Sequence, residues 1–323
     1  MGGGSFREEP PIRPSTAGYG KCGDMSESRA MPGPTIPDGL IDRLGRGLGS
    51  LKMLPAVAQE ALEVANSSDC DLVKLAVIIQ RDLRLTTFIL RLANSSLFAP
   101  PKPIASLHQA VLFIGRRKAR DFIITSCLES VASKVPQELQ DRQSTLWLHG
   151  FLTAILAVRL NELFQLKFQG EEFTAGLMHD FGRTLVSVID PVNAASLDPL
   201  DFNETSSIED RERALLGASH AEIGAWFAAH NELPANLISA IQFHHHAQDA
   251  GEDLKLAALI ATADHAVNYL QREGQGKGYN PLTNGAALIL EANGVPKATT
   301  TFGTASEKLL QEIPKLAQSM MQG

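Results

Sequence analysis

A histidine and an aspartate, His179 and Asp180, stand next to each other in an apolar segment, residues 173–183. Phe173 and Leu177 recur there at helical spacing, which predicts that the pair lies on a buried helix face. A neutral imidazole beside a carboxylate is half of a binding site for a borderline divalent cation, and apolar surroundings would strengthen its affinity. The pair alone is weak evidence, so the prediction depends on further ligands elsewhere in the chain.

Other histidines and aspartates interrupt apolar helical patterns in the same way. Burying such a residue is costly unless it is paired or bound to a cation. These positions are His149, His220, the run His244-His245-His246 and Asp264. Imidazole and carboxylate ligands together suit Mn, Fe or Zn, so these residues and the pair form a constellation with the chemistry of a divalent metal site. Structural alternatives exist, with His149 as a core histidine, Asp180 as a helix cap and Asp264 as a hydrogen-bond partner of histidine.

The composition is that of an ordinary soluble globular protein, with 323 residues, 44% hydrophobic and 20% charged. This length allows two lobes or one large helical domain. A net charge of −7 argues against nucleic-acid binding, because that binding depends on an excess of Lys and Arg. One local basic cluster occurs, and we favour a solvated helix face for it. It consists of Arg116, Arg117, Lys118 and Arg120.

The three cysteines, Cys22, Cys70 and Cys127, are an odd number without CxxC spacing. They predict neither a disulfide framework nor a thiolate zinc site, which favours a cytoplasmic protein. No run approaches the roughly 18 apolar residues that a membrane span needs, and no signal-peptide core is seen at the N-terminus. We therefore expect no membrane association.

Helical signals succeed one another through the first half of the chain. Residues 1–36 are rich in Gly, Pro and Ser and are predicted to form a flexible tail. Asp38 is the expected cap of a first helix. Ser106 is predicted to open a later helix that Gly115 ends or bends. Between them, helices are expected over 55–64, 71–80 and 83–93, followed by a Pro-rich elbow at 99–103.

The second half is also predicted to be helical. The His179-Asp180 pair is expected within one helix, 171–189, and His220 within another, 209–229. The polar segment 190–207 between them is predicted to be a long loop and a candidate lid. The expected division of the chain is a tail at 1–36, an N-terminal lobe at 37–140, a second lobe at 141–273 and a helical extension at 274–323. That extension would pack on the domain or mediate self-association.

Three motifs carry a resemblance to a known family. They are Val77-Ile78-Ile79-Gln80-Arg81-Asp82, then Ile89-Leu90-Arg91-Leu92-Ala93-Asn94-Ser95, then Ile104-Ala105-Ser106-Leu107 through Ile114-Gly115. Their order resembles the HDOD family of bacterial signalling proteins, from about Leu51 to about Ala247. The resemblance implies an all-α, two-lobed, HD-domain-like helical bundle related to HD phosphohydrolases but without catalysis. Leu83 departs from the family pattern, which tends to have Pro there.

The resemblance also implies seven candidate metal ligands, at the positions where HD hydrolases place theirs: His149, His179, Asp180, His220, His244, His245 and Asp264. Two such metals could clamp a phosphodiester and generate a hydroxide. Arg183 stands where active members often have Lys and is the phosphate-contact candidate. Residues 246–251 lack the Gly-Tyr-Pro motif, which excludes the cyclic-dinucleotide phosphodiesterases that carry it.

Two functions from different classes follow. The favoured hypothesis is a non-catalytic, cytoplasmic signalling module that binds a protein partner or a small ligand, such as a nucleotide. It would do so through the HD-like site and the interface of the two lobes. The alternative is a metal-dependent phosphohydrolase acting on a nucleotide or cyclic dinucleotide, with His179 and Asp180 as central ligands of Mn, Fe or Zn. A DNA-binding regulator ranks last, because no basic recognition helix is predicted.

Overall fold

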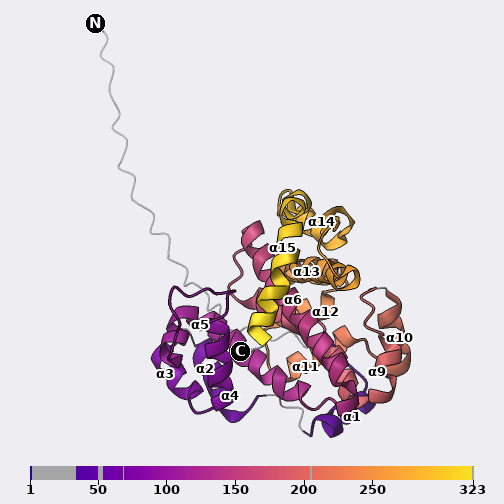
Figure 1. Cartoon of the computed structure of the whole chain (residues 1–323), viewed down its shortest axis with the longest axis horizontal. Coiled ribbons are helices and arrows are strands. Elements are labelled where there is room, and N and C mark those ends of the chain that lie inside the picture. The colour runs from indigo at the N-terminus through magenta and orange to yellow at the C-terminus, as the bar shows by residue number, and fades with distance from the viewer. Residues whose placement is uncertain (2–33, 50–53, 68, 204–205, 322–323) are drawn as a thin grey trace.

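The regular structure of this chain is helical, and the predicted all-α, two-lobed fold is confirmed. The computed structural model describes residues 1, 34–49, 54–67, 69–203 and 206–321, and no strand occurs within these ranges. Most of the predicted tail, 1–36, lies outside them. Figure 1 shows α2 to α5 gathered in one bundle and the later helices in another.

The helix bounds follow the chain in order. They are α1 Asp38–Leu48, α2 Ala56–Asn66, α3 Leu72–Ile79, α4 Leu83–Ala93, α5 Leu107–Ala132, α6 Gln140–Phe164, α7 Glu171–Met178, α8 Phe181–Ile189, α9 Pro191–Leu197, α10 Ser206–Leu216, α11 His220–His230, α12 Ala235–Phe243, α13 Leu254–Glu273, α14 Gly285–Ala292 and α15 Ala298–Met321. Short 3-10 helices occur at Gln137–Leu139, Ala247–Asp249, Gly251–Asp253 and Pro281–Thr283.

Side-chain caps fix where the helices of the first bundle begin. Asp71 accepts from the backbone N–H groups at the start of α3, Asp82 accepts from that of Leu85 in α4, and Ser106 accepts from that of Gln109 in α5. The predicted cap at Asp38 is wrong. Pro37 precedes α1 and its carbonyl oxygen accepts from the first turn, which leaves Asp38 as the first helical residue.

A sharp bend divides α5 at Gly115, where φ is 76° and ψ is 172°. A residue with a Cβ rarely adopts this positive φ, so the glycine permits the bend. The basic cluster Arg116 to Lys118 follows the bend directly. The predicted bend therefore sets the direction of the helix half that faces the second bundle.

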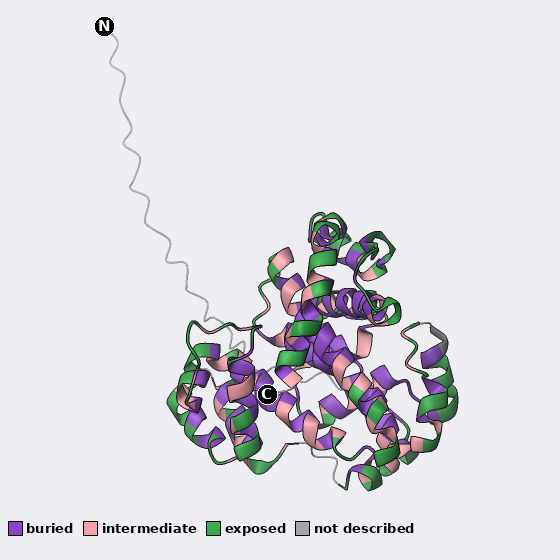
Figure 2. Ribbon diagram, in the orientation of Figure 1, coloured by how far each residue is buried: buried purple, intermediate pink, exposed green. Residues whose placement is uncertain are grey.

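The centre of the second bundle is α6, which packs against α7, α13 and α15. Figure 2 shows buried residues concentrated on these central helices and exposed ones on the outer faces. Burial of this apolar surface is the main stabilising contribution, at about 25 cal/mol per Å². The C-terminal helix α15 thus belongs to the core of this bundle, with Phe302, Leu310 and Ile313 fully buried.

The first helix, α1, packs against α8 of the second bundle. Arg43 forms an ion pair with Asp190 at 2.8 Å, and Gly47 allows close approach to Val188. The boundary between the two predicted lobes, 140 and 141, stays a prediction. Within the described part of the chain, no helix is both long and apolar enough to cross a membrane.

Three predictions about the second half are wrong. The expected helix 171–189 is broken into α7 and α8 at the His179-Asp180 pair. The expected helix 209–229 is likewise two helices, α10 and α11, because Gly217 adopts a φ of 82° and Ser219 caps a new start. The expected loop 190–207 contains α9, which Asp190 caps and Pro191 begins.

Candidate metal centre

Seven side chains predicted as ligands converge in the interior of the second bundle. They form two neighbouring groups, and within each group one ligand atom of every member lies within 4.8 Å of the others. The first group is His149, His179 and Asp264, and the second is Asp180, His220, His244 and His245. All are buried except His245, which is half-buried. The adjacent pair His179-Asp180 therefore contributes one ligand to each group.

Small residues bring α6 close enough to α7 for the first group to form. A Cβ on Gly176 would lie 2.6 Å from the Cα of Ala154, and one on Gly150 would lie 3.0 Å from the carbonyl oxygen of Leu177. Real Cβ atoms do not approach backbone atoms at 2.6 Å, so Gly176 is required for this packing. The close approach places His149 of α6 opposite His179 at the end of α7.

The break between α7 and α8 positions the second group. His179 still has helical dihedrals, whereas Asp180 has φ −100° and ψ 9°. In one continuous helix, adjacent side chains point about 100° apart. Here α7 ends at the pair, and the turn at Asp180 lets the two neighbouring side chains serve different groups. Two residues on, a Cβ at Gly182 would overlap the carbonyl oxygen of His220. Glycine there lets α11 bring His220 down onto Asp180.

In the first group, the Nε2 atom of His149 is the shared neighbour. It lies 3.2 Å from Nε2 of His179 and 3.0 Å from Oδ1 of Asp264. Nε2 of His179 lies 3.5 Å from the same Asp264 oxygen. Oδ2 of Asp180 is 3.6 Å from both imidazole nitrogens, so this carboxylate bridges the two groups.

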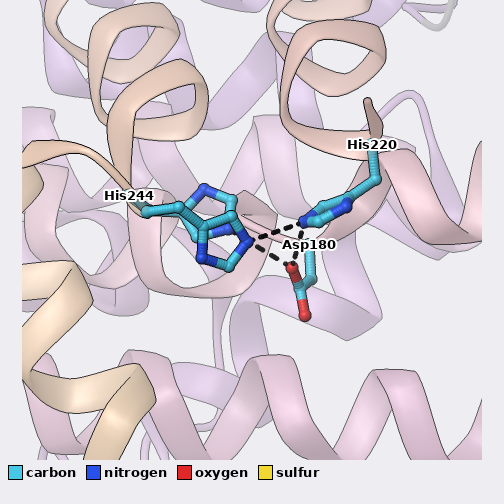
Figure 3. Close-up of side chains that lie close together, drawn as sticks. Asp180, His220 and His244 are labelled. Carbon is cyan, nitrogen blue, oxygen red and sulfur yellow. Dashed lines mark hydrogen bonds and ion pairs between the residues drawn. The ribbon is translucent and has the colours of Figure 1, made fainter. Parts of the chain in front are cut away.

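In the second group, Oδ1 of Asp180 faces two imidazoles. It lies 3.3 Å from Nε2 of His220 and 3.5 Å from Nε2 of His244. Figure 3 shows these rings converging on the carboxylate from separate helices. Nε2 of His220 is also 3.0 Å from Nε2 of His245. Each group therefore contains a close pair of imidazole nitrogens beside a carboxylate oxygen.

Four of the histidines direct their other nitrogen, Nδ1, at an oxygen acceptor outside the groups. The Nδ1 of His179 donates to the carbonyl of Gly176, and that of His244 donates to the carbonyl of Ile241, each at 2.7 Å. The acceptors for His149 and His220 are side chains: Oε1 of Gln271 at 2.6 Å and Oε2 of Glu212 at 2.6 Å. With the proton held at Nδ1, the Nε2 lone pair faces inward, the orientation of histidines that bind metals.

Burial and the two aspartates shift the pKa values of these groups in opposite directions. Burial lowers the pKa of His244, and burial together with the neighbouring His244 lowers that of His245 well below its usual range. Burial would also lower the pKa of His149, but Asp264 and Asp180 outweigh it and raise that pKa to about 9. For His220, Glu212 and Asp180 outweigh burial and raise the pKa to about 10.

The pKa of both aspartates lies well below the ordinary value, so both are ionised. Burial would raise it, but Arg183 and His179 outweigh burial for Asp180, and His149 and His179 do so for Asp264. Two carboxylates thus keep their charge in the interior, and this charge attracts cations into the space between the rings.

The donor atoms fit divalent metal ions. Both oxygens of Asp180 and Nε2 of His244 are buried and form no hydrogen bond of acceptable geometry, although each lies near neighbouring polar atoms. Buried polar atoms without such bonds are rare in folded proteins. The arrangement of inward Nε2 atoms beside a carboxylate needs a proton or a metal cation between them. Imidazole and carboxylate donors in this number suit two ions of the Mn, Fe or Zn type.

Arg183, the phosphate-contact candidate, is buried and lies against two carboxylates. Its Nε is 3.3 Å from Oδ1 of Asp180, and its Nη1 is 3.4 Å from Oδ2 of Asp198. Arg142 contacts the same Asp198 oxygen at 2.9 Å. The guanidinium thus stabilises the ionised form of Asp180 and links it to the start of the segment after α9.

A polar pocket of about 290 Å³ reaches the two groups. His244, His245 and Asp264 are among its lining residues. The other polar residues of the lining are Asn203, His265, Asn268, Arg272 and Asn284. This pocket provides a route by which a small molecule can approach the ligands.

Phe202 covers one edge of the pocket. Its ring stacks on His149, with centroids 5.8 Å apart and an interplanar angle of 24°. Its carbonyl oxygen accepts from Arg272 at 3.1 Å, and its φ is 57°. Phe202, in the segment predicted as a lid, thus lies against a candidate ligand, and the lid itself stays a prediction.

Sequence reasoning did not find Glu212, Gln271 or Phe202. Gln271 follows Asp264 by seven residues on α13, so helical spacing puts both on one face, and this signal was available. Glu212 belongs to a charged stretch, 209–213, that is typical of a solvated helix. Phe202 lies in a segment without periodicity. The contacts of Glu212 and Phe202 depend on how α10 and the segment that contains Phe202 pack against the candidate metal centre.

Solved structures with the same fold were found by comparison. An HDOD domain protein from Geobacter sulfurreducens aligns with a TM-score of 0.66 and 20% identity, covering 86% of this chain and 97% of its own. A candidate phosphohydrolase from Shewanella amazonensis SB2B aligns with a TM-score of 0.63 and 24% identity, covering 85% and 98%. A candidate signal transduction protein from Marinobacter aquaeolei VT8 aligns at 0.57 and 17%, covering 88% and 64%. At these identities, the likeness shows the fold.

A curated relative and a family model extend the comparison to the sequence. An uncharacterized protein of Treponema pallidum (strain Nichols) is 25% identical over 228 residues, covering 70% of this chain. The chain spans 44% of that relative's length. The family model for the HDOD domain matches residues 51–247. That range holds the three motifs and six of the seven converging ligands, all but Asp264. The chain belongs to the HDOD family.

Proposed function

We propose that this protein is a cytoplasmic signalling module of the HDOD family whose second bundle binds two divalent metal ions. The observation that carries the proposal is the pairing of imidazole Nε2 atoms at 3.2 Å and 3.0 Å beside ionised, buried aspartates. A cation between such atoms offsets the cost of burying them. The output of the module would be the binding of a protein partner or a small ligand.

The metal proposal is tested on protein purified without chelator or immobilised nickel. Elemental analysis is expected to find about two equivalents of Mn, Fe or Zn in the parent protein. The double variant His179→Ala/Asp180→Ala removes one ligand from each group and is expected to contain none. His108→Ala, in the first bundle, is the matched control and should retain the parent's content. A metal-free parent that takes up no added Mn, Fe or Zn would refute the proposal.

A second candidate function, a metal-dependent phosphohydrolase acting on a nucleotide or cyclic dinucleotide, is favoured by the pocket. Arg272 and Asn268 line the pocket beside the ligand Asp264, where a phosphate could bind. When bound, two divalent ions would supply Lewis-acid polarisation of a phosphoryl group and acidify a water molecule. The residues of the chain would bind and orient the substrate, with Arg183 keeping Asp180 ionised.

The two functions are separated by a turnover assay on metal-loaded protein. Bis(p-nitrophenyl) phosphate is a general phosphodiester probe. Hydrolysis that disappears in both the His179→Ala/Asp180→Ala variant and in Arg272→Ala supports the phosphohydrolase. Metal binding without hydrolysis supports the binding module. Crosslinking of the metal-loaded chain is then the experiment that identifies protein partners.

A further inference from the structure

A second pocket lies between the two bundles, away from the candidate metal centre. Its volume is about 530 Å³, within the range of small-molecule sites in proteins. The walls come from α5 on one side and from α6, the segment after it and α7 on the other. Four aromatic rings form much of this lining: Phe98, Phe122, Phe168 and Phe173. A planar, largely apolar ring fits such walls.

Cationic and anionic side chains line different parts of this pocket. The cations are Arg116, Arg117 and Lys118, all at the bend of α5. Arg117 is exposed, and Lys118 is half-buried with its Nζ 4.8 Å from the centre of the Phe98 ring. Within the described part of the chain, none of these three side chains forms an ion pair with a carboxylate within 4 Å. Nη1 of Arg116 donates to the backbone carbonyl of Ser67 at 2.8 Å, so Arg117 and Lys118 are the side chains that can receive an anionic group.

A buried carboxylate lies deeper in the same pocket. Asp121 follows Lys118 by three residues, so both are on the same face of α5. Oδ1 of Asp121 accepts from Nε of Arg120 at 2.9 Å, whereas the buried Oδ2 accepts no hydrogen bond. The side chain is 1% exposed, and Oδ2 lies beside Gly170, another residue of the pocket wall. A buried carboxylate oxygen without a donor costs free energy that an N–H group of a ligand would recover.

Two other acidic side chains line this pocket, and both already have partners. Oε2 of Glu162 accepts from Nη1 of Arg159 at 3.2 Å. Oε2 of Glu172 accepts from the backbone N–H of Gly170 at 2.8 Å, and its Oε1 accepts from Nδ2 of Asn161 at 3.1 Å. Asn161 in turn donates to and accepts from the backbone of Phe168. Glu172 and Asn161 therefore fix the wall, and Asp121 is the side chain left to recognise a donor.

We infer that this pocket binds a guanine nucleotide, with its base between the phenylalanines, the N1–H and 2-amino groups directed at Asp121 and the phosphate at Arg117 and Lys118. The arrangement matches a ligand that has an aromatic body, a hydrogen-bond donor at one end and an anion at the other. The site is separate from the seven candidate metal ligands, so the inference does not depend on the proposed metal centre. It assigns a role to the basic cluster that we first interpreted as a solvated helix face.

Isothermal titration of the chain with GMP tests the site above pH 7, where the Asp121 carboxyl, with a pKa of about 7, is ionised. The double variant Arg117→Glu/Lys118→Glu should weaken GMP binding roughly tenfold or more, because it replaces charge-assisted phosphate contacts by repulsion. The matched control is Arg84→Glu, an exposed arginine of the first bundle that lies outside this pocket. The control should bind GMP like the parent.

The recognition of the ring is tested on the ligand as well as on the protein. Purine riboside 5′-monophosphate lacks the N1–H and 2-amino donors of GMP and should bind roughly tenfold more weakly, since it leaves Asp121 without a donor. Asp121→Asn should reduce this preference. Val158→Trp fills the pocket from α6 and should abolish binding of both compounds, which keeps the test decisive if the Asp121 variant does not fold.

Two outcomes would overturn the inference. One is no GMP binding at millimolar concentration. The other is binding that Val158→Trp leaves unchanged or that inorganic phosphate matches, which would indicate only a general anion site. Circular dichroism of each variant shows that it is folded before it is titrated.

Discussion

Nε2 of His149 lies 3.2 Å from Nε2 of His179, while the Nδ1 atoms of both rings face oxygen acceptors on the outer side. Two lone pairs thus converge unless a proton or a metal ion lies between them. In the absence of metal, the raised pKa of His149, about 9, supplies that proton. Metal binding and proton release are therefore expected to be linked in this protein.

The acceptors of the Nδ1 protons are expected to control metal affinity. Glu212→Gln removes the carboxylate that lies 2.6 Å from Nδ1 of His220. Loss of such a partner typically weakens metal affinity about 10- to 100-fold. Competitive titration with a chromophoric chelator measures this change. Asp210→Asn, an exposed residue of the same helix, is the control with the same change of charge, and equal affinities for the two variants would contradict the prediction.

Phe202 is expected to slow the exchange of bound metal. Its ring stacks on His149 at 5.8 Å, and aromatic contacts of this kind contribute about 0.5 to 1.5 kcal/mol. Phe202→Ala should therefore speed metal transfer to a chelator by roughly threefold to tenfold. Stopped-flow absorbance gives the rate. An unchanged rate would show that the ring does not limit access, and Phe202→Leu separates loss of the aromatic face from loss of bulk.

Gly182 is expected to be essential for joining α8 to α11. A Cβ there would overlap the carbonyl oxygen of His220, which belongs to the backbone and cannot turn aside. Gly182→Ala should lower the free energy of unfolding by about 3 kcal/mol or more and disrupt the second ligand group. Gly45→Ala is the matched control, because nothing lies within 4 Å of that Cβ position. In the interior of α1, it should raise stability by up to about 1 kcal/mol. Urea denaturation followed by circular dichroism compares the two, and equal stabilities would contradict the prediction.

Asp121 is expected to make stability depend on pH. Burial, only partly offset by Arg120, raises the pKa of its carboxyl from 3.8 to about 7. The folded state then holds a proton that the unfolded state releases. Stability from this group is fully present below about pH 4 and is lost as pH rises to about 7, a change of roughly 4 kcal/mol. Asp121→Asn removes it, so the parent should lose stability relative to the variant over this range. Urea titrations at several pH values measure the difference in unfolding free energy between the parent and the variant. This difference isolates Asp121 from the other carboxylates. Unfolding free energies that change with pH in the same way for both proteins would count against the prediction.

Much of the fold followed from local signals. The caps at Asp71 and Ser106 and the bend at Gly115 act within a few residues, so they could be predicted from the sequence directly. The expected continuous helix at 171–189 was wrong for a different reason. The apolar periodicity of this segment continues across the pair His179-Asp180. In the structure one helix ends and the next begins at this pair, and its two side chains belong to different ligand groups.

The candidate ligands could be found from sequence because each is a polar residue in an apolar helix, where burial without a partner is costly. The all-helical class and the family could therefore be predicted from the sequence, as could the identity of the seven candidate side chains. Three relationships appeared only in the folded chain: the division of these side chains into two groups, the acceptors of their Nδ1 protons, and the position of Asp121 beside a pocket under the basic cluster. These relationships join residues on different helices, such as Glu212 with His220 and Gln271 with His149. They depend on how the helices pack, and local sequence patterns carry little information about contacts between distant segments.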